Sequence, residues 1–191
     1  MSKIVGVVSD THGHLPEKAI SVLKGEFEDE RIVESLVVKN MEGSTPSHEA
    51  VDLIIHAGDI GELEPLSQGV LDDLERIAPV YAVLGNRDLE GYETRSGSVS
   101  EQLLLLDVCG ASIAVMHKPE DLQAALGLSG DNPLVRIHGH THIPKLERRG
   151  EGIVLCPGAL HRPKGDWPMR TVARLVVEES GRLVRADIVK I

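Results

Sequence analysis

Aromatic side chains are scarce in this sequence. Only four of its 191 residues are aromatic, namely Phe27, Tyr81, Tyr92 and Trp167. Proteins that bind single-stranded nucleic acids stack the bases on several such rings, and this chain has too few of them to build a stacking platform. The interior must therefore be packed with aliphatic side chains.

Basic residues are also outnumbered. The chain has 20 lysine and arginine residues against 30 aspartate and glutamate residues, which gives a formal net charge of -10. A field of this sign repels nucleic acids and anionic membranes, so we expect neither as a partner. A phosphate-bearing substrate would need a local source of positive charge.

Cysteines and long apolar runs are nearly absent as well. Cys109 and Cys156 lie in apolar stretches without the CxxC spacing, so a disulfide framework is not expected. No apolar run approaches the roughly 18 residues that a membrane helix needs, and the first residues lack the pattern of a secretion signal. We expect a cytoplasmic protein, and its oligomeric state stays open.

The length and the hydrophobic pattern predict one α/β domain over residues 1–191. Short apolar runs that end in polar turns alternate with helical spacing, and a strand-rich region follows. Residues 26–50, which begin with an acidic cluster, predict a helix or strand with a loop. Strands are expected at 4–8, 53–56, 80–84, 103–108, 112–116, 134–137, 153–155, 171–177 and 183–189, and helices at 16–24, 63–77 and 119–126.

Polar side chains that suit metal ions follow several of the predicted strands. Open sheets with crossover helices place their ligands at the carboxyl ends of the strands, so these residues are expected to converge. Imidazole and carboxylate together suit zinc, iron, manganese or nickel better than magnesium or calcium. Because residues two apart on an extended backbone point the same way, the two side chains of each closely spaced pair are predicted to bind the same metal ion. The residues are Asp10 and His12, Asp59, Asn86, His117, and His140 and His142.

Each of these residues also has a local explanation. Asp10 and Asp59 are typical helix caps, and Asn86 is typical of a turn. Caps and turns, however, do not require four histidines at the ends of strands. The joint pattern therefore favours a metal site.

In this order, the blocks Asp10-x-His12, Gly58-Asp59, Gly85-Asn86, His117 and Gly139-His140-x-His142 resemble those of the calcineurin-like metallophosphoesterases. The similarity is closest to the small single-domain phosphodiesterases, a subgroup that also includes the retromer scaffold subunit. Pro157-Gly158 after a late strand is a further shared feature. The resemblance implies an α/β fold in which two facing sheets form a sandwich flanked by helices.

The resemblance also implies a dinuclear centre. One divalent transition metal would be held by Asp10, His12, Asp59 and His142, and the other by Asp59, Asn86, His117 and His140. Manganese is the first expectation, and nickel, iron and zinc are the others. Two such ions lower the pKa of a shared water, so the implied activity is phosphodiester hydrolysis by a metal-bridging hydroxide. The substrate would be a small phosphate ester.

The stretch between Asp10 and Asp59 is longer than in the smallest members of the family, and we interpret residues 26–50 as an insertion. The chain also departs from the family at two blocks. At His117, relatives often have Thr-His-Gly-His, whereas this chain has Met116-His117-Lys118-Pro119. Many relatives have a histidine after the asparagine, and it protonates the leaving group, whereas this chain has Gly85-Asn86-Arg87-Asp88. We predict that Asn86, Arg87 and Asp88 form the catalytic group here. Arg87 is expected to clamp a phosphate oxygen or pair with a carboxylate, and Asp88 to orient a histidine. Lys118, directly after His117, adds a positive charge beside the site.

Two other functions stay open. The chain could be a non-catalytic scaffold that binds partner proteins, like the retromer subunit, or a nucleotide phosphatase or pyrophosphohydrolase. Of the remaining histidines, His56 and His138 lie in apolar strands and are predicted to be core groups. His14 and the pair His161-Arg162 are candidates to reach a bound phosphate from loops.

Overall fold

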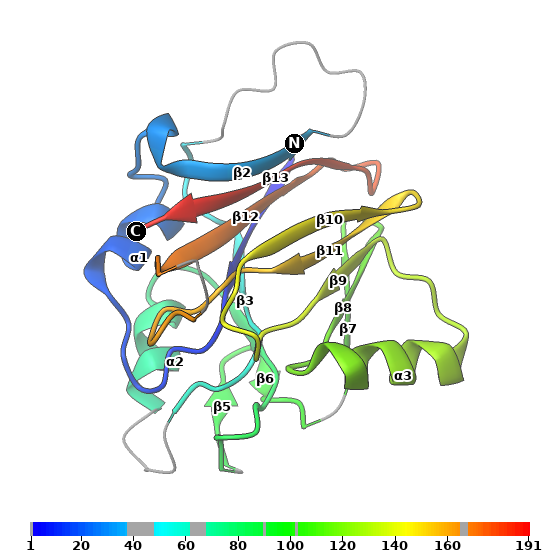
Figure 1. Cartoon of the computed structure of the whole chain (residues 1–191), viewed down its shortest axis with the longest axis horizontal. Helices are drawn as coiled ribbons and strands as arrows, with labels where there is room; N and C mark the ends of the chain where they lie inside the picture. Colours follow the sequence, from blue (N-terminus) through cyan, green and yellow to red (C-terminus); the bar gives the residue numbers. More distant parts are fainter. Residues whose placement is uncertain (1, 38–47, 62–67, 90, 102, 165–167) are drawn as a thin grey trace.

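The computed structural model describes residues 2–37, 48–61, 68–89, 91–101, 103–164 and 168–191. Over this part of the chain, two larger sheets face one another and helices lie on their outer sides (Figure 1). The predicted α/β sandwich of two sheets is thereby confirmed. None of the helices in these ranges has the length and apolar character of a membrane span.

The first sheet has six strands in the order β2-β13-β12-β1-β3-β4. β1, β3 and β4 are parallel to one another, and β12, β13 and β2 continue the sheet in antiparallel pairs. The three parallel strands therefore end at the same edge. The strands are β1 (Lys3–Val8), β2 (Ile32–Val37), β3 (Leu53–His56), β4 (Val80–Ala82), β12 (Thr171–Val177) and β13 (Leu183–Lys190).

The second sheet has five strands in the order β10-β11-β9-β8-β7. β7 and β8 form the predicted hairpin, and β8, β9 and β11 are parallel. A small two-stranded sheet, β5 (Glu93–Thr94) with β6 (Gly97–Ser98), lies apart from it. The five strands are β7 (Leu104–Val108), β8 (Ala111–Val115), β9 (Val135–Ile137), β10 (Lys145–Arg149) and β11 (Gly152–Cys156).

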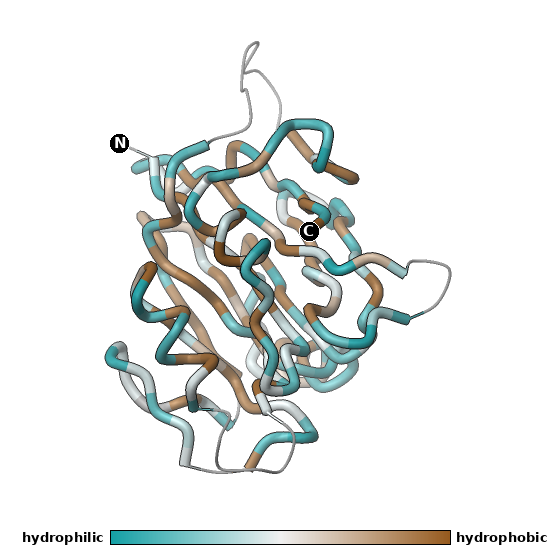
Figure 2. The backbone as a smooth tube through the Cα atoms, turned by 90° about the vertical axis from the view of Figure 1, so that its left-hand side faces the viewer, coloured by the Kyte–Doolittle hydropathy of each residue, from teal (hydrophilic) through white to brown (hydrophobic). Residues whose placement is uncertain are grey.

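Aliphatic side chains fill the space between the layers. The largest buried cluster joins the inner faces of both sheets, with Val7 and Ile55 from one and Ile113 and Ile137 from the other. A second cluster packs α1 (Glu17–Leu23) and α2 (Gln68–Glu75) on the outside of the first sheet, and a third packs α3 (Pro119–Ser129) on the second. Figure 2 shows the apolar stretches in the strands of the interior.

Most predicted strands are present, but β10 is an addition. Its sequence Lys-Leu-Glu-Arg-Arg has one apolar residue, Leu146, which faces the core, while its neighbours stay outside. A single inward side chain gives too little alternation to predict a strand. The expected helix at 63–77 is observed as α2, and residues 62–67 lie outside the described residues.

The segment 26–50 begins with a short 3₁₀ turn (Asp29–Arg31) and the edge strand β2, which pairs with β13. Residues 38–47 lie outside the described part, so the interpretation as an insertion stays a prediction. Arg174 of β12 is buried and holds the two ends of the segment together. Its guanidinium donates hydrogen bonds to the carbonyls of Val22 and Leu23 and to that of Glu49, and it lies over the ring of Phe27.

Candidate metal centre

The predicted metal ligands meet where the parallel strands of both sheets end. Asp10 follows β1, Asp59 follows β3 and Asn86 follows β4, while His117 and His140 follow β8 and β9 of the other sheet. The convergence arises because the parallel strands of each sheet place their carboxyl ends at one edge. Hydrogen bonds between the loops fix this arrangement, for example from the Asp10 N–H to the carbonyl of Gly58 and from the Gly139 N–H to the carbonyl of His117.

One half of the site contains Asp10, His12, Asp59 and His142. One ligand atom from each of the four residues lies within 4.8 Å of those of the others. Nε2 of His142 is 3.1 Å from Oδ1 of Asp10, and Nε2 of His12 is 3.8 Å from Oδ2 of Asp59. This set is the one that the resemblance assigns to a single metal ion.

The other half contains Asn86, His117 and His140. Nε2 of His117 is 3.4 Å from Oδ1 of Asp59, and Nδ1 of His140 is 2.9 Å from Oδ1 of Asn86. The rings of His117 and His140 are 5.2 Å apart between centroids. Asp59 faces both halves with different oxygens, so the structure brings together all seven predicted residues.

Buried ligand atoms without hydrogen-bond partners indicate that a cation fits here. Oδ1 of Asp10 and Nε2 of His117 are buried and make no hydrogen bond. Nδ1 of His117 donates to the carbonyl of Ala57, and Nδ1 of His142 donates to that of Arg162, so in each neutral imidazole the lone pair on Nε2 faces a carboxylate oxygen. Two acceptor atoms therefore lie 3.1 Å apart in the His142–Asp10 pair and 3.4 Å apart in the His117–Asp59 pair. Each pair needs a proton or a metal ion between its atoms, because buried polar groups without a partner are costly.

The charges of the site favour a positive species at these positions. Burial alone would raise the pKa of Asp59, but its contacts with His117 and the Arg87 N–H hold that pKa below its ordinary value. The Asp10 carboxylate raises the pKa of His142. Burial lowers the pKa of His117, yet Asp59 outweighs it and the pKa is raised. Without metal these histidines therefore attract protons, which a bound cation would replace.

Five of the site residues have a left-handed backbone. The φ angles are +52° for Asp10, +46° for His12, +53° for Asp59, +65° for His140 and +61° for His142. This conformation is uncommon outside glycine and concentrates at functional sites. The prediction that the two closely spaced pairs lie on an extended backbone is therefore wrong. Asp10 and His12 do share one half of the site, but His140 and His142 turn into different halves.

Gly85 allows the asparagine loop to approach Asp59. A Cβ atom at this position would overlap the carboxylate and the backbone N of Asp59. Gly85 is therefore required by close packing, not only by the turn.

We expect Gly85→Ala to displace Asp59 and to weaken Mn²⁺ binding by roughly 10 to 100-fold, the range seen when groups supporting metal ligands are altered. Isothermal titration calorimetry on chelator-treated protein measures this. Gly69→Ala is the matched control, because nothing lies within 4 Å of a Cβ there, and its metal affinity should equal that of the wild type. Equal affinities in both variants would contradict the packing argument.

His56 joins two of the loops that carry predicted metal ligands through buried hydrogen bonds. It is fully buried, its Nδ1 accepts the N–H of Gly58, and its Nε2 therefore carries the proton and donates to Oγ1 of Thr11 at 2.9 Å. The Thr11 hydroxyl in turn donates to the carbonyl of Ile60. Burial lowers the pKa of His56 to about 4, so the ring is neutral. The prediction that His56 is a core group is confirmed.

This buried imidazole makes stability depend on pH. The unfolded chain binds a proton at His56 below the ordinary pKa of 6.5, whereas the folded chain does so only near 4. The contribution of His56 to the free energy of unfolding should therefore fall as pH decreases from 6.5 toward 4, by about 2 kcal/mol at pH 5. Urea unfolding of metal-free protein at pH 7.5 and pH 5 measures the net change, to which His117 and His142, with their raised pKa values, contribute with the opposite sign. This net change should be the same in the wild type and in the exposed-site control His48→Gln. In His56→Gln the free energy of unfolding should fall by that amount less, and equal changes in all three would contradict it.

Arg87 and Asp88 take different positions. The backbone N–H of Arg87 donates to Oδ1 of Asp59 at 2.9 Å, and its side chain is exposed. The two carboxylate oxygens of Asp88 accept the N–H groups of Gly61 and Gly85, both at 2.8 Å. Asp88 thus ties two loops together, which differs from the prediction that it orients a histidine.

An open cavity of about 290 Å³ lies over the site. Its cationic lining comes from Arg87, Arg162 and Lys164. Arg162 was a candidate from the sequence, but Lys164 was missed, although it follows Arg162 by two residues in the same loop. Lys118 lines a neighbouring cavity of about 350 Å³ that also touches Asn86.

The other candidate histidines form a row beside the first half of the site. The ring of His161 is 5.9 Å from that of His12, and the ring of His14 is 6.1 Å from that of His161. Neither His14 nor His161 lines the cavity over the site. Their predicted contact with phosphate therefore stays a prediction.

The fold and this arrangement of ligands are those of a metallophosphoesterase. The family model of the calcineurin-like phosphoesterase superfamily domain matches residues 4–180. The chain therefore belongs to this superfamily, as the sequence blocks predicted. Membership and the cluster of ligands together support a hydrolase that binds divalent metal.

Two archaeal relatives carry the name "Probable metallophosphoesterase". The one from Methanocaldococcus jannaschii is 29% identical over 182 residues, which are 92% of this chain and 77% of the relative. The one from Methanothermobacter thermautotrophicus is 29% identical over 190 residues, which are 98% of this chain and 92% of the relative.

Solved structures share the fold at lower identity. An archaeal phosphodiesterase superposes with a TM-score of 0.65 at 18% identity, over 98% of this chain and 99% of that chain. Vps29 of Entamoeba histolytica, solved with Zn²⁺, superposes with a TM-score of 0.61 at 16% identity, over 98% of each chain. These similarities concern the fold.

Proposed function

We propose that this protein is a phosphodiesterase that depends on two divalent metal ions. The observation that carries the proposal is the pair of ligand sets that share Asp59, with oxygens facing His12 on one side and His117 on the other. A cluster with one bridging carboxylate suits two cations better than one. An archaeal protein of the same fold is described as a phosphodiesterase.

The residues divide into two binding sets. Asp10, His12, Asp59 and His142 would hold one ion, and Asp59 with the set Asn86, His117 and His140 would hold the other. When bound, two such ions lower the pKa of a shared water toward neutrality and neutralise the charge of the phosphoryl group. Manganese is the metal we propose, since carboxylate, amide and imidazole ligands all suit it.

The protein's own groups orient the substrate. Arg87, Arg162 and Lys164 line the cavity above the ligands and would attract a phosphate in a chain whose net charge is -10. In the hydrolysis a P–O bond to water forms, and the P–O bond to the leaving alcohol breaks. The Arg87 guanidinium would contact a phosphoryl oxygen as a fork of two donors.

No imidazole follows Asn86, so the leaving group lacks the usual proton donor. General acid catalysis is typically worth about 10² to 10⁴ in rate. We therefore propose that diesters with acidic leaving groups, such as p-nitrophenol, are turned over far faster than diesters of aliphatic alcohols. We place the activity in the cytoplasm, where the two free cysteines would stay reduced.

The scaffold function is the second candidate, because Vps29 proteins share the fold. The seven convergent side chains favour the enzyme, but Vps29 of Entamoeba histolytica was itself solved with Zn²⁺, so turnover and not metal binding separates the two functions. The test is hydrolysis of bis(p-nitrophenyl) phosphate by chelator-treated protein with and without added Mn²⁺, together with elemental analysis of protein purified without chelator.

We expect Mn²⁺-dependent turnover and close to two metal ions per chain. The absence of turnover with both sites loaded would favour the scaffold. Parallel assays with a monoester, a cyclic diester and a dinucleoside polyphosphate would identify a nucleotide phosphatase or pyrophosphohydrolase, if one of these substrates is preferred.

A further inference from the structure

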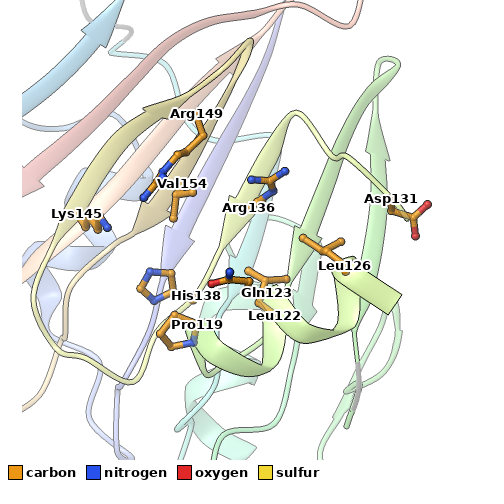
Figure 3. Close-up of a pocket in the computed structure, with 11 residues that line it drawn as sticks. Pro119, Leu122, Gln123, Leu126, Asp131, Arg136, His138, Lys145, Arg149 and Val154 are labelled. Atoms are coloured by element: carbon orange, nitrogen blue, oxygen red, sulfur yellow. The ribbon is translucent and has the colours of Figure 1, made fainter. Parts of the chain in front are cut away.

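A further cavity lies on the outer face of the second sheet. None of the seven predicted metal ligands lines it, although His138 and Pro119 of its lining are each two positions from one of them. α3 packs over β8 through Ala114, Leu122 and Leu126, but it leaves the outer faces of β9, β11 and β10 uncovered. The resulting groove, here called the α3 groove, has a volume of about 510 Å³ (Figure 3). This volume lies within the range of small-molecule sites, roughly 300 to 1,000 Å³.

The alternation of the strands places cations in the α3 groove. Val135 and Ile137 of β9 face the core, so Arg136 between them faces outward. Leu146 of β10 also faces the core, so Lys145 and Arg149 lie on the outer side. Figure 3 shows Arg136 next to α3, and Lys145 and Arg149 on β10 across the groove from the helix. Asp131 is the acidic residue among those that line the groove, so basic side chains outnumber acidic ones here in a chain with a net charge of -10.

Arg136 has donors available for an anion. Its Nη2 donates to the amide oxygen of Asn132 at 2.7 Å. Its Nε is buried and has no hydrogen-bond partner, so a ligand in the groove would contact the outer N–H groups of the guanidinium. Lys145 and Arg149 both pair with Glu147, at 2.7 and 2.8 Å. Those are exposed ion pairs, which contribute little and exchange readily. Among the described residues, Arg136 forms no ion pair, so it is the strongest anchor for a new anion.

The remaining walls define the body of the ligand. Pro119, Leu122, Leu126 and Val154 provide apolar surface. The imidazole of His138 is the one aromatic ring among the described residues that line the groove, so the groove offers no large aromatic platform for a nucleobase. An aliphatic chain fits these walls, and a carboxylate or phosphate at its end fits Arg136.

We propose that the α3 groove binds a small organic anion with an aliphatic body, and that Arg136 holds its acidic group. This site is separate from the metal centre and goes beyond the proposed function. Its residues take no part in holding metal, so the inference stands or falls independently of phosphodiesterase activity.

The test is an NMR titration of the ¹⁵N-labelled, chelator-treated full chain with hexanoate, hexyl phosphate, inorganic phosphate and hexan-1-ol. We expect hexanoate or hexyl phosphate to give saturable shifts at backbone amides of α3 and β9–β11, and the uncharged alcohol to bind more weakly. The acid that binds more tightly identifies the source of the charge. AMP is added as a nucleotide probe and should bind more weakly than hexyl phosphate.

Three variants complete the experiment. Arg136→Gln should weaken binding roughly tenfold or more, and Arg149→Gln, an exposed position, should weaken it to a lesser extent. Arg148→Gln removes the same charge from the same strand, but its side chain reaches toward Val37 instead of the groove, so binding should be unchanged. Shifts confined to the metal cavity, no saturation up to about 10 mM, equal binding by Arg136→Gln and Arg148→Gln, or tighter binding of AMP would overturn the proposal.

Discussion

Asp59→Asn should abolish most of the metal-dependent hydrolysis of bis(p-nitrophenyl) phosphate. Asp59 faces His12 with one oxygen and His117 with the other, and an amide offers one neutral oxygen in place of two charged ones. A metal ion supplies several kcal/mol of transition-state stabilisation, and about 1.4 kcal/mol corresponds to a tenfold change in rate. We therefore expect kcat/KM to fall roughly 10³-fold.

The same variant should bind fewer than two metal ions per chain by elemental analysis. Asp72→Asn is the matched control, since Asp72 is exposed on α2 and contacts the side chain of Gln68. That control should retain full activity and metal content. If Asp59→Asn kept wild-type turnover with both ions bound, Asp59 would not be the bridging ligand.

Arg174→Met should destabilise the fold by about 2 kcal/mol. Burial lowers the pKa of Arg174 to about 10, so it remains charged at neutral pH, and it donates to carbonyls of Val22, Leu23 and Glu49. Methionine fills the space but removes these hydrogen bonds, which are worth about 1 kcal/mol each, offset in part because no charge is buried. The carbonyls of Val22 and Leu23 also accept the N–H groups of Gly25 and Val51, so the penalty of an unsatisfied acceptor does not apply to them.

Urea denaturation at pH 7 measures this difference as a shift of the midpoint. Arg182→Met is the control, because Arg182 is exposed and forms a surface ion pair with Glu178, and such pairs are worth about 0 to 1 kcal/mol. A change below about 1 kcal/mol in Arg174→Met would show that the ends of the 26–50 segment are held together by other contacts.

The strands and the ligands were predictable because both depend on local chemistry. Short apolar runs such as residues 4–8 and 53–56 are typical of covered strands, and the polar residues that follow them lie at the shared edge where the parallel strands end. Asp10, Asp59 and His117 therefore converge as expected. The division of the ligands into two sets came from the family resemblance, and the contacts of the structure agree with it.

Other features depend on contacts that the sequence does not encode locally. β10 is defined by its pairing with β11 and not by its own pattern, since only Leu146 enters the core. The role of Asp88 as a tie between loops depends on amide groups of Gly61 and Gly85 that are 24 positions apart in the chain. The hydrogen bonds of Arg174 join residues more than a hundred positions apart in the chain, so no short sequence motif could reveal them.

The left-handed backbone at five ligand positions has a consequence for protein engineering. Asparagine and glycine adopt this conformation more readily than alanine or branched residues do. An alanine scan of Asp10, His12 or Asp59 would therefore mix lost coordination chemistry with conformational strain. At Asp10 and Asp59, replacement by the isosteric asparagine separates the two effects. Libraries designed to change the chemistry of this centre should therefore favour asparagine and glycine at the positions with a left-handed backbone.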